Sequence, residues 1–454
     1  MALQGQRLLL HAQGRAQHGL SLIGQDEAVA GALEQGSAHR LLQRAQAPAH
    51  GRLRLAQLAG GGAQGAFPRD GQEDGQVTPF QDAHKLTQTK SHGIRTVLKI
   101  SMHCGWAQGL WAPMRAPLEP EQNTMIPTMK AAIVETQNGP FRITDIARPQ
   151  PAAGQVLVRI QASGVNPLDT KIRAGAAAHA RHPLPAILGL DLAGVVEAVD
   201  PGVTTFRPGD EVYGMTGGVG GLQGSLAQYA AVDADLLALK PANLTMREAA
   251  ALPLVAITAW EGLMDRAKVR PRQTLLVQGG AGGVGHMAVQ IGRALGAKVY
   301  ATASAEDAGY VRGLGATPID YAAETVADYV GRLTGGKGFE LVYDTNGGAV
   351  LDASFQAVAR FGHVVSALGW GSHALAPLSF KGATYSGVFT LAPLLTGVDR
   401  AHHGEILAQV TTLVEAGKLL PRLDPRTYTL DSVAEAHTAI TDRSAKGKIV
   451  VSIA

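Results

Sequence analysis

Cysteine is almost absent from this sequence. Of the 454 residues one is a cysteine, Cys104, which lies within the first 128 residues. Disulfide frameworks, CxxC redox motifs and cysteine-based zinc sites are therefore excluded from the rest of the chain. Because disulfides persist in oxidising compartments, this favours a reducing cytoplasm as the location of the protein.

Long apolar runs and a strong charge of one sign are also lacking. No stretch reaches the roughly 18 consecutive apolar residues typical of a membrane-spanning helix, so we expect no membrane segment. The formal charge of +3 comes from residues 1–128, which hold 12 Lys or Arg and 9 acidic residues, whereas residues 129–454 hold 28 of each. Nucleic-acid binders usually concentrate basic residues on one face, so we expect no nucleic-acid partner.

Residues 1–128 lack the regular strand and helix patterns of the rest of the chain. They are rich in Gln, Ala, Gly, Arg and His, with low-complexity loops at 60–65 and 71–76. We interpret them as a low-complexity extension, read from a start codon placed too early, with Met125 and Met129 as alternative starts. A partner-binding tail is the alternative interpretation, although no motif supports it.

The pattern becomes regular from Met129 onward. At 454 residues the chain is too long for one core and predicts two or three domains. Short strands separated by Gly and Pro turns, typical of a mostly β, barrel-like domain, are predicted to about residue 240. These predicted strands are 130–134, 155–162, 194–199, 211–214 and 227–232.

Beyond residue 240 the pattern changes to alternating strands and helices, which indicates a parallel sheet covered by helices on both faces. From about residue 391 we predict one amphipathic helix and a final strand that fold back onto the first domain. The predicted elements after residue 240 are helices 246–252, 286–295, 305–313 and 404–416, and strands 275–277, 299–302, 341–343, 363–368 and 448–453.

The segment 274–286 predicts a nucleotide site. It reads as a buried strand followed by a glycine-rich turn that opens a helix, and Gly280, Gly282 and Gly285 have the G-x-G-x-x-G spacing. Such glycines allow a tight turn, close backbone approach to a pyrophosphate and close helix packing. The free N–H groups of the helix start then bind the anion. We therefore assign cofactor contacts to the whole turn: Gly280, Ala281, Gly282, Gly283, Val284 and Gly285.

Residues 129–454 resemble the medium-chain dehydrogenase/reductase superfamily, most closely its zinc-free NADPH:quinone oxidoreductase branch. The motifs that carry the resemblance are SGVNPLD at 163–169, LGLDLAGVV at 188–196, FRPGDEVY at 206–213, GSLAQY at 224–229 and AGGVG at 281–285. The resemblance implies an α/β fold in which a doubly wound Rossmann domain, 257–390, is inserted in a GroES-like, mostly β catalytic domain. That catalytic domain would comprise 129–256 and the return segment 391–454.

Zinc is not expected. Zinc-dependent relatives carry a Cys where this chain has Val165 or Asn166, and a His-Glu pair where it has Leu190 and Asp191. A catalytic zinc needs three protein ligands. His179 and His182, three residues apart in a loop, lack a third ligand and are expected to be surface residues.

The resemblance also implies the residues around the reacting groups. Asn166 should contact the nicotinamide ribose or line the substrate cleft, and Thr258 should face the same pocket. The alternative for Asn166 is a residue that only makes an Asx-Pro turn. Relatives often have a Tyr at the position of Lys171, which could stabilise an enolate or simply reach solvent. The loops around Leu368, Gly369 and Phe389 match the nicotinamide-facing loops of the family.

NADPH is the expected cofactor, with NADH also open. NAD-specific enzymes usually place an acidic residue at the end of the second Rossmann strand, where this chain has Ala303. Ser304 could bind the 2′-phosphate of NADPH, and Tyr310, Arg312 or Tyr321 could flank it.

Two acidic residues near the expected 2′-phosphate site are unfavourable for NADPH. Asp307 replaces a lysine of close relatives, so Glu306 and Asp307 would repel the phosphate unless a cation compensates. Lys448, or Lys446 nearby, is expected to reach the adenine side.

These expectations describe a zinc-independent, NADPH-dependent reductase that transfers hydride to a quinone or an α,β-unsaturated carbonyl, with Asn166 and Lys171 as catalytic candidates. The family resemblance further implies a homodimer. The alternatives are a reductase or dehydrogenase of another small carbonyl or alcohol, and a low-turnover NADPH-binding regulatory protein.

Overall fold

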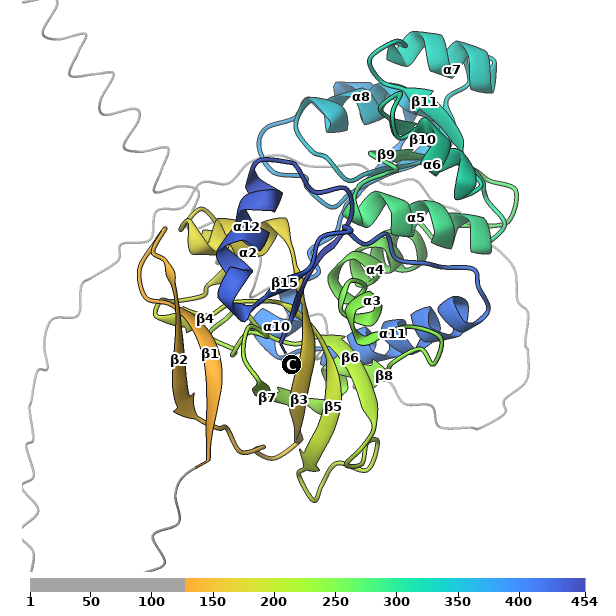
Figure 1. Cartoon of the computed structure of the whole chain (residues 1–454). Helices are drawn as coiled ribbons and strands as arrows, with labels where there is room; N and C mark the ends of the chain where they lie inside the picture. Colours follow the sequence, from red (N-terminus) through yellow and green to blue (C-terminus); the bar gives the residue numbers. More distant parts are fainter. Residues whose placement is uncertain (1–126, 454) are drawn as a thin grey trace, which may run out of the picture. The chain divides into compact units, whose positions relative to one another are not determined.

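The computed structural model describes residues 127–453 (Figure 1). The predictions for residues 1–126, including the extension, the alternative start at Met125 and the lone Cys104, lie outside the described residues. Among the helices of residues 127–453, none has the length and apolar character that crossing a membrane requires.

The β-rich part consists of two sheets. A small sheet has the order β2-β1-β4, and a larger one has the order β15-β16-β3-β5-β6-β8, with β7 also paired to β3. The strands not in the return segment are β1 (Thr128–Val134), β2 (Phe141–Ala147), β3 (Gln155–Val165), β4 (Ala186–Ile187), β5 (Asp191–Val199), β6 (Glu211–Met215), β7 (Tyr229–Asp233) and β8 (Leu237–Leu239).

Strand β3 is the centre of the larger sheet. It pairs with β5, β7 and β16, and Val156, Val158 and Ile160 alternate along it into one apolar core. The five predicted strands of this region are confirmed. Strands β2, β4 and β8 were not predicted, because they are short or only half buried and show weak alternation.

The second half contains a six-stranded sheet with the order β11-β10-β9-β12-β13-β14. All five strand pairs are parallel, which confirms the predicted parallel sheet. This order is that of dinucleotide-binding Rossmann sheets. The strands are β9 (Thr274–Gln278), β10 (Lys298–Ala303), β11 (Thr317–Asp320), β12 (Phe339–Asp344), β13 (Val358–Ser366) and β14 (Thr384–Gly387).

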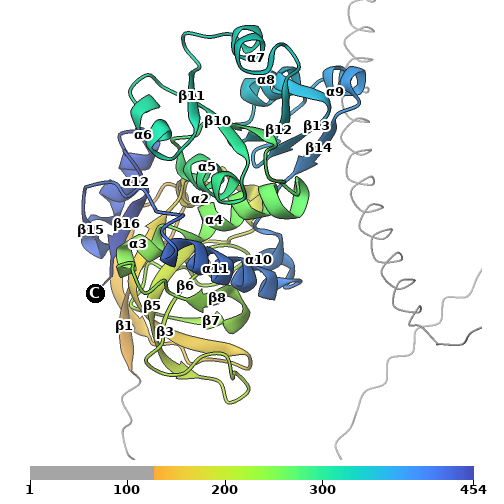
Figure 2. The same ribbon diagram turned by 90° about the vertical axis from the view of Figure 1, so that its right-hand side faces the viewer.

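Successive residues of the central strand face opposite cores. Leu275 and Val277 of β9 pack with the core that contains α5, whereas Leu276 packs with the core that contains Leu351 and Phe355 of α8. The sheet is therefore covered on both faces (Figure 2). The helices of this half are α4 (Pro253–Trp260), α5 (Gly283–Ala294), α6 (Ala308–Gly313), α7 (Val326–Thr334), α8 (Ala349–Ala357) and α9 (Ala376–Lys381).

Helix α4 joins the two halves. It packs against α5 on one side and against β5, β6 and α11 (Arg400–Glu415) on the other. A π-helical turn, η3 (Glu261–Arg266), continues α4 directly. The other helices of the β-rich part are α2 (Pro167–Arg173) and α3 (Met246–Ala250).

The last segment returns to the β-rich part. Strand β16 (Ile449–Ser452) pairs antiparallel with the end of β3, with Ile449 opposite Val165. The segment holds three helices where one was predicted, since α10 (Ala392–Thr396) and α12 (Val433–Thr441) accompany α11. Beside them lies the short strand β15 (Tyr428–Thr429). The predicted domain boundaries at 256 and 390 stay a prediction.

Candidate active site

A cavity of about 1170 Å³ lies between the two halves of the described chain. Its walls come from the end of β3, the start of α2, α4 and the loops that follow β9, β10, β12, β13 and β14. In open parallel sheets, ligands bind outside the carboxyl ends of the strands, and the cavity lies at that edge.

The glycine turn forms one wall of the cavity. Ala281, Gly282, Gly283 and Val284 line it, and α5 begins at Gly283 without a side-chain cap, so its first N–H groups stay available to an anion. The other two assigned residues, Gly280 and Gly285, do not line the cavity. Their missing side chains instead allow close packing: a Cβ at Gly280 would meet the side chain of Ala301, and one at Gly285 would overlap the Gly279 carbonyl. The turn therefore fits a dinucleotide pyrophosphate.

Asn166 is held by buried charged groups at another wall of the cavity. It precedes α2 in extended conformation, and its backbone N–H donates to Asp169 Oδ2 at 2.8 Å. Its side-chain Nδ2 donates to Asp191 Oδ2 at 2.9 Å, and Lys448 Nζ donates to its Oδ1. Asn166 is therefore more than an Asx-Pro turn residue, because both ends of its amide are fixed.

The charges around Asn166 are almost completely removed from water. Lys448 is 6% exposed, and its Nζ lies 4.0 Å from Asp191 Oδ2. Burial raises the pKa of Asp191 to about 6 and that of Asp169 to about 7, and it lowers the pKa of Lys448. Taking charges out of water costs more than a single ion pair returns, so these groups are costly to the fold.

Two members of this cluster were missed or placed elsewhere from the sequence. Asp191 was considered only as the residue at a zinc-ligand position, yet it also accepts a hydrogen bond from Leu254 N at 2.9 Å. Lys448 was expected on the adenine side. Its ammonium group lies beside Asn166 instead, because the pairing of β16 with β3 brings residue 448 next to Val165.

Thr258 lies on α4 and lines the cavity. Its Oγ1 donates to Leu254 O at 2.6 Å and lies 3.1 Å from Thr390 Oγ1. Lys171 also lines the cavity but is exposed to solvent, so both roles considered for it stay open.

An aromatic wall completes this end of the cavity. Of the residues assigned to the nicotinamide-facing loops, Leu368 and Phe389 line the cavity, whereas Gly369 does not, because the Tyr385 hydroxyl fills the space beside it. Trp370, which was not predicted, lies 5.1 Å from the ring of His179 and 6.1 Å from that of Phe389, measured between centroids.

The histidine pair is not simply on the surface, contrary to expectation. Both His179 and His182 are half-buried. His179 packs on Trp370, and His182 Nδ1 accepts a hydrogen bond from Gly221 N at 3.3 Å. Among residues 127–453, no three His, Cys or acidic residues lie close enough together to hold a metal ion.

The loop after β10 carries both acids and their cations. Ser304 lines the cavity, and its Oγ lies 3.3 Å from Asp307 Oδ2. The guanidinium of Arg422 pairs with Asp307 Oδ1 at 3.0 Å, and Lys446 Nζ pairs with Glu306 at 2.7 Å. Of the two lysines considered for the adenine side, Lys446 therefore lies at this loop, whereas Lys448 lies beside Asn166.

The predicted tyrosines of this loop have different positions. Tyr321 lines the cavity and is exposed, whereas Tyr310 does not line it and packs under Arg422, whose Cζ lies 4.1 Å from the ring centroid. Sequence reasoning missed Arg422 because 115 residues separate it from Asp307.

Comparison with known proteins agrees with this architecture. Residues 152–242 match the alcohol dehydrogenase GroES-like domain family, and residues 314–451 match the zinc-binding dehydrogenase family. This confirms the expected fold, a Rossmann-type parallel sheet combined with a GroES-like domain.

Individual relatives cover nearly all of the described region. The chain is 34% identical over 316 residues to the chloroplastic NADPH-dependent alkenal/one oxidoreductase of Arabidopsis thaliana, covering 68% of this chain and 74% of that protein. It is 32% identical over 314 residues to a quinone oxidoreductase of Sus scrofa, covering 68% of this chain and 92% of that protein.

A solved structure is more similar still. The crystal structure of an alcohol dehydrogenase superfamily protein from Novosphingobium aromaticivorans is 63% identical, has a TM-score of 0.71, and is matched over 72% of this chain and 100% of that one. The chain therefore belongs to the medium-chain dehydrogenase/reductase superfamily, as an oxidoreductase of its NADPH:quinone oxidoreductase-like group.

Proposed function

We propose that this protein is an NADPH-dependent reductase of quinones or α,β-unsaturated carbonyl compounds. One observation carries the proposal: a single cavity joins the uncapped start of α5 to the buried Asn166–Lys448 cluster and to the aromatic wall. The start of α5 suits a dinucleotide phosphate, and the cluster together with the aromatic wall suits a flat, conjugated acceptor. The relatives from Arabidopsis and pig, named as an alkenal/one oxidoreductase and a quinone oxidoreductase, support the same acceptor class.

The chain's own residues would bind and orient the reactants. A bound nicotinamide supplies the hydride. Asp191 and Lys448 fix the amide of Asn166, which leaves its second N–H hydrogen and second oxygen lone pair for ribose or acceptor. The nearby ammonium group of Lys448 would stabilise negative charge that develops on the reduced acceptor, an effect that is stronger in a site with little water.

Zinc has no part in the proposed reaction. At the position of a zinc ligand in relatives, Leu190 has no donor atom, and the carboxylate of Asp191 is occupied by Asn166 and Leu254. Metal analysis of the purified active protein tests this, and zinc that is bound stoichiometrically and is required for turnover would contradict it.

We propose NADPH over NADH on the basis of the loop after β10. The acids that would repel a 2′-phosphate are each paired with a cation from the return segment, Asp307 with Arg422 and Glu306 with Lys446. Ser304 lines the cavity beside them. The loop is therefore compensated in charge, and an added phosphate would share Arg422 with Asp307.

We further propose a cytoplasmic homodimer. Strand β14 is the edge of the six-stranded sheet among the described residues. Two phenylalanines near it, Phe361 and Phe380, are 80% and 83% exposed. An exposed edge with large apolar side chains favours pairing with a second copy. Molecular mass in solution, measured by light scattering, tests the dimer.

The deciding assay supplies the full chain with NADPH or NADH and a panel of quinones, enones, simple aldehydes and alcohols, and follows cofactor absorbance. Oxidation of NADPH that depends on a quinone or enone supports the proposal. Turnover only with simple carbonyls or alcohols would favour another small-molecule reductase or dehydrogenase. Tight NADPH binding without turnover would favour a regulatory protein.

A further inference from the structure

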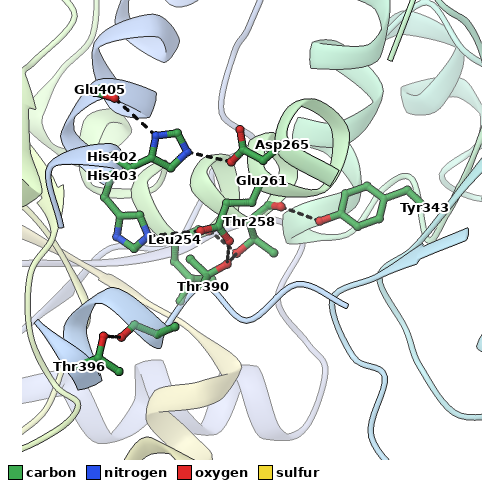
Figure 3. A network of polar contacts seen from close by, with 11 residues as sticks. Leu254, Thr258, Glu261, Asp265, Tyr343, Thr390, Thr396, His402, His403 and Glu405 are labelled. Carbon is green, nitrogen blue, oxygen red and sulfur yellow. Dashed lines mark hydrogen bonds and ion pairs between the residues drawn. The ribbon is translucent and has the colours of Figure 1, made fainter. Parts of the chain in front are cut away.

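Buried polar groups of α4, η3, α11 and the loop after β14 form a connected chain (Figure 3). Thr258 and Thr390 both line the cavity and are each 7% exposed. Thr390 Oγ1 lies 3.1 Å from Thr258 Oγ1 and 2.8 Å from Glu261 Oε2. The carboxyl group of Glu261 is thus one hydroxyl away from the cavity.

Glu261 is paired on its other side with a histidine that has no access to solvent. His403 of α11 is 0% exposed, and its Nε2 lies 3.4 Å from Glu261 Oε1. Neither ring nitrogen of His403 has a hydrogen-bond partner among residues 127–453. Burying ring nitrogens without hydrogen bonds is costly, and Glu261 is the acid within reach of this imidazole.

The position of Glu261 in the fold is also unusual. It is the first residue of the π-helical turn η3, which continues α4. Such turns are rare and often occur at functional sites. Here the turn follows Thr258 by one helical turn, so that the acid and the cavity hydroxyl lie on the same side of α4.

The hydroxyl groups have two complete hydrogen-bond arrangements. If Glu261 is protonated, it would donate to Thr390, while Thr390 donates to Thr258 and Thr258 donates to Leu254 O. If Glu261 is ionised, Thr390 donates to Glu261 and Thr258 turns to donate to Thr390. Passing one proton from Glu261 into the cavity converts the first arrangement into the second, because each hydroxyl gives one proton and receives another.

We propose that His403, Glu261, Thr390 and Thr258 form a relay that delivers the proton consumed in the reduction. The inference rests on the proposed function. Reduction of an enone adds a hydride, supplied by the nicotinamide, to the β-carbon, while the electrons of the C=C bond leave an enolate. Thr258 then gives its proton to the α-carbon of the enolate. Thr390 passes its proton to Thr258, and Glu261 passes its proton to Thr390. His403 returns a proton to Glu261, and the same hydroxyl chain, acting in reverse, takes up a proton from water in the vacant cavity before the next turnover.

The experiment compares Thr390→Val, Thr390→Ser and Glu261→Gln with the unaltered full chain. Valine keeps the shape and removes the hydroxyl, serine keeps the hydroxyl, and glutamine can donate a hydrogen bond to Thr390 but cannot release a proton. The matched control is Asp265→Asn, which breaks the surface pair Asp265–His402 (2.9 Å) between the same two elements, η3 and α11.

The readouts are kcat, KM, the solvent deuterium isotope effect on kcat, and the dissociation constant of NADPH. We expect Thr390→Val and Glu261→Gln to lower kcat roughly 10- to 100-fold, with an increased isotope effect and KM and NADPH affinity within about 2-fold, as for loss of a general acid. Thr390→Ser should restore most of the rate, and Asp265→Asn should leave it unchanged.

A kcat within about 2-fold of normal for Glu261→Gln would overturn the relay while leaving the proposed function intact, since such an acid normally contributes far more. Equal losses in Thr390→Val and Thr390→Ser, or an isotope effect that no variant alters, would show that the network is only structural. Absence of acceptor-dependent NADPH oxidation by the unaltered protein would overturn both the relay and the proposed function.

Discussion

Replacing Asp169 by Asn tests whether the charges beneath the active site are costly to the fold. Asp169 is the third residue of α2, and its Oδ2 accepts a hydrogen bond from the N-cap N–H of Asn166, while its Oδ1 is buried without a partner among the described residues. Asparagine can keep the single hydrogen bond through its own oxygen. The change therefore removes mainly the charge.

The size of the effect follows from the pKa of Asp169, which burial raises from 3.8 to about 7. At about 1.4 kcal/mol for each tenfold change in proton affinity, this shift corresponds to a free energy of about 4 kcal/mol. Because the folded-state pKa lies above the unfolded value, the folded protein binds the proton more tightly. The free energy of unfolding of the unaltered protein therefore falls by about this amount as pH rises from about 4 to about 7. Asp169→Asn should be more stable by up to roughly this amount at about pH 8 and similar at about pH 4.

The assay is urea or thermal unfolding of both proteins across this pH range, and α7 offers a matched control. Asp328 is also the third residue of its helix and accepts from the N-cap N–H of Thr325, at 3.0 Å, but it is exposed and its hydrogen bonds to Thr325 lower its pKa. Asp328→Asn should therefore destabilise slightly, and only above the pKa of Asp328. An Asp169→Asn protein that is less stable than the unaltered protein at about pH 8 would refute the reasoning.

Three further predictions concern the cofactor and the reaction. Arg422→Ala should weaken NADPH binding roughly 10- to 100-fold in calorimetry and leave NADH within about 2-fold, since one charge-assisted contact is lost and Asp307 is left unpaired; equal losses for both cofactors would contradict a 2′-phosphate role. Lys448→Met should lower kcat/KM for the best acceptor by about 100-fold or more, because the buried cation that fixes Asn166 is removed; an unchanged value would remove Lys448 from the mechanism. Gly285→Ala should abolish NADPH binding or folding, as judged by calorimetry and circular dichroism, because the added Cβ would overlap the Gly279 carbonyl; normal binding would contradict the packing described for this turn.

Elements with strong local periodicity were predictable from the sequence. The strand, glycine turn and helix at 274–294 were identified because buried strands, G-x-G-x-x-G turns and amphipathic helices each have a pattern within about 20 residues. Short elements such as β8 and α12 were missed. Their three to nine residues show too little periodicity to be distinguished from loops, and the packing of neighbours stabilises them.

The sequence by itself determined the fold class and the position of the glycine turn, and it singled out Asn166 as a candidate, because these depend on local spacing and on ordered motifs. Only the tertiary structure brought Lys448 to Asn166, across 282 residues, and Arg422 to Asp307. It also placed Glu261 of η3 against His403 of α11. The physical reason is that strand register and helix packing decide which distant polar groups are buried together, and the free energy of a buried charge depends on those partners.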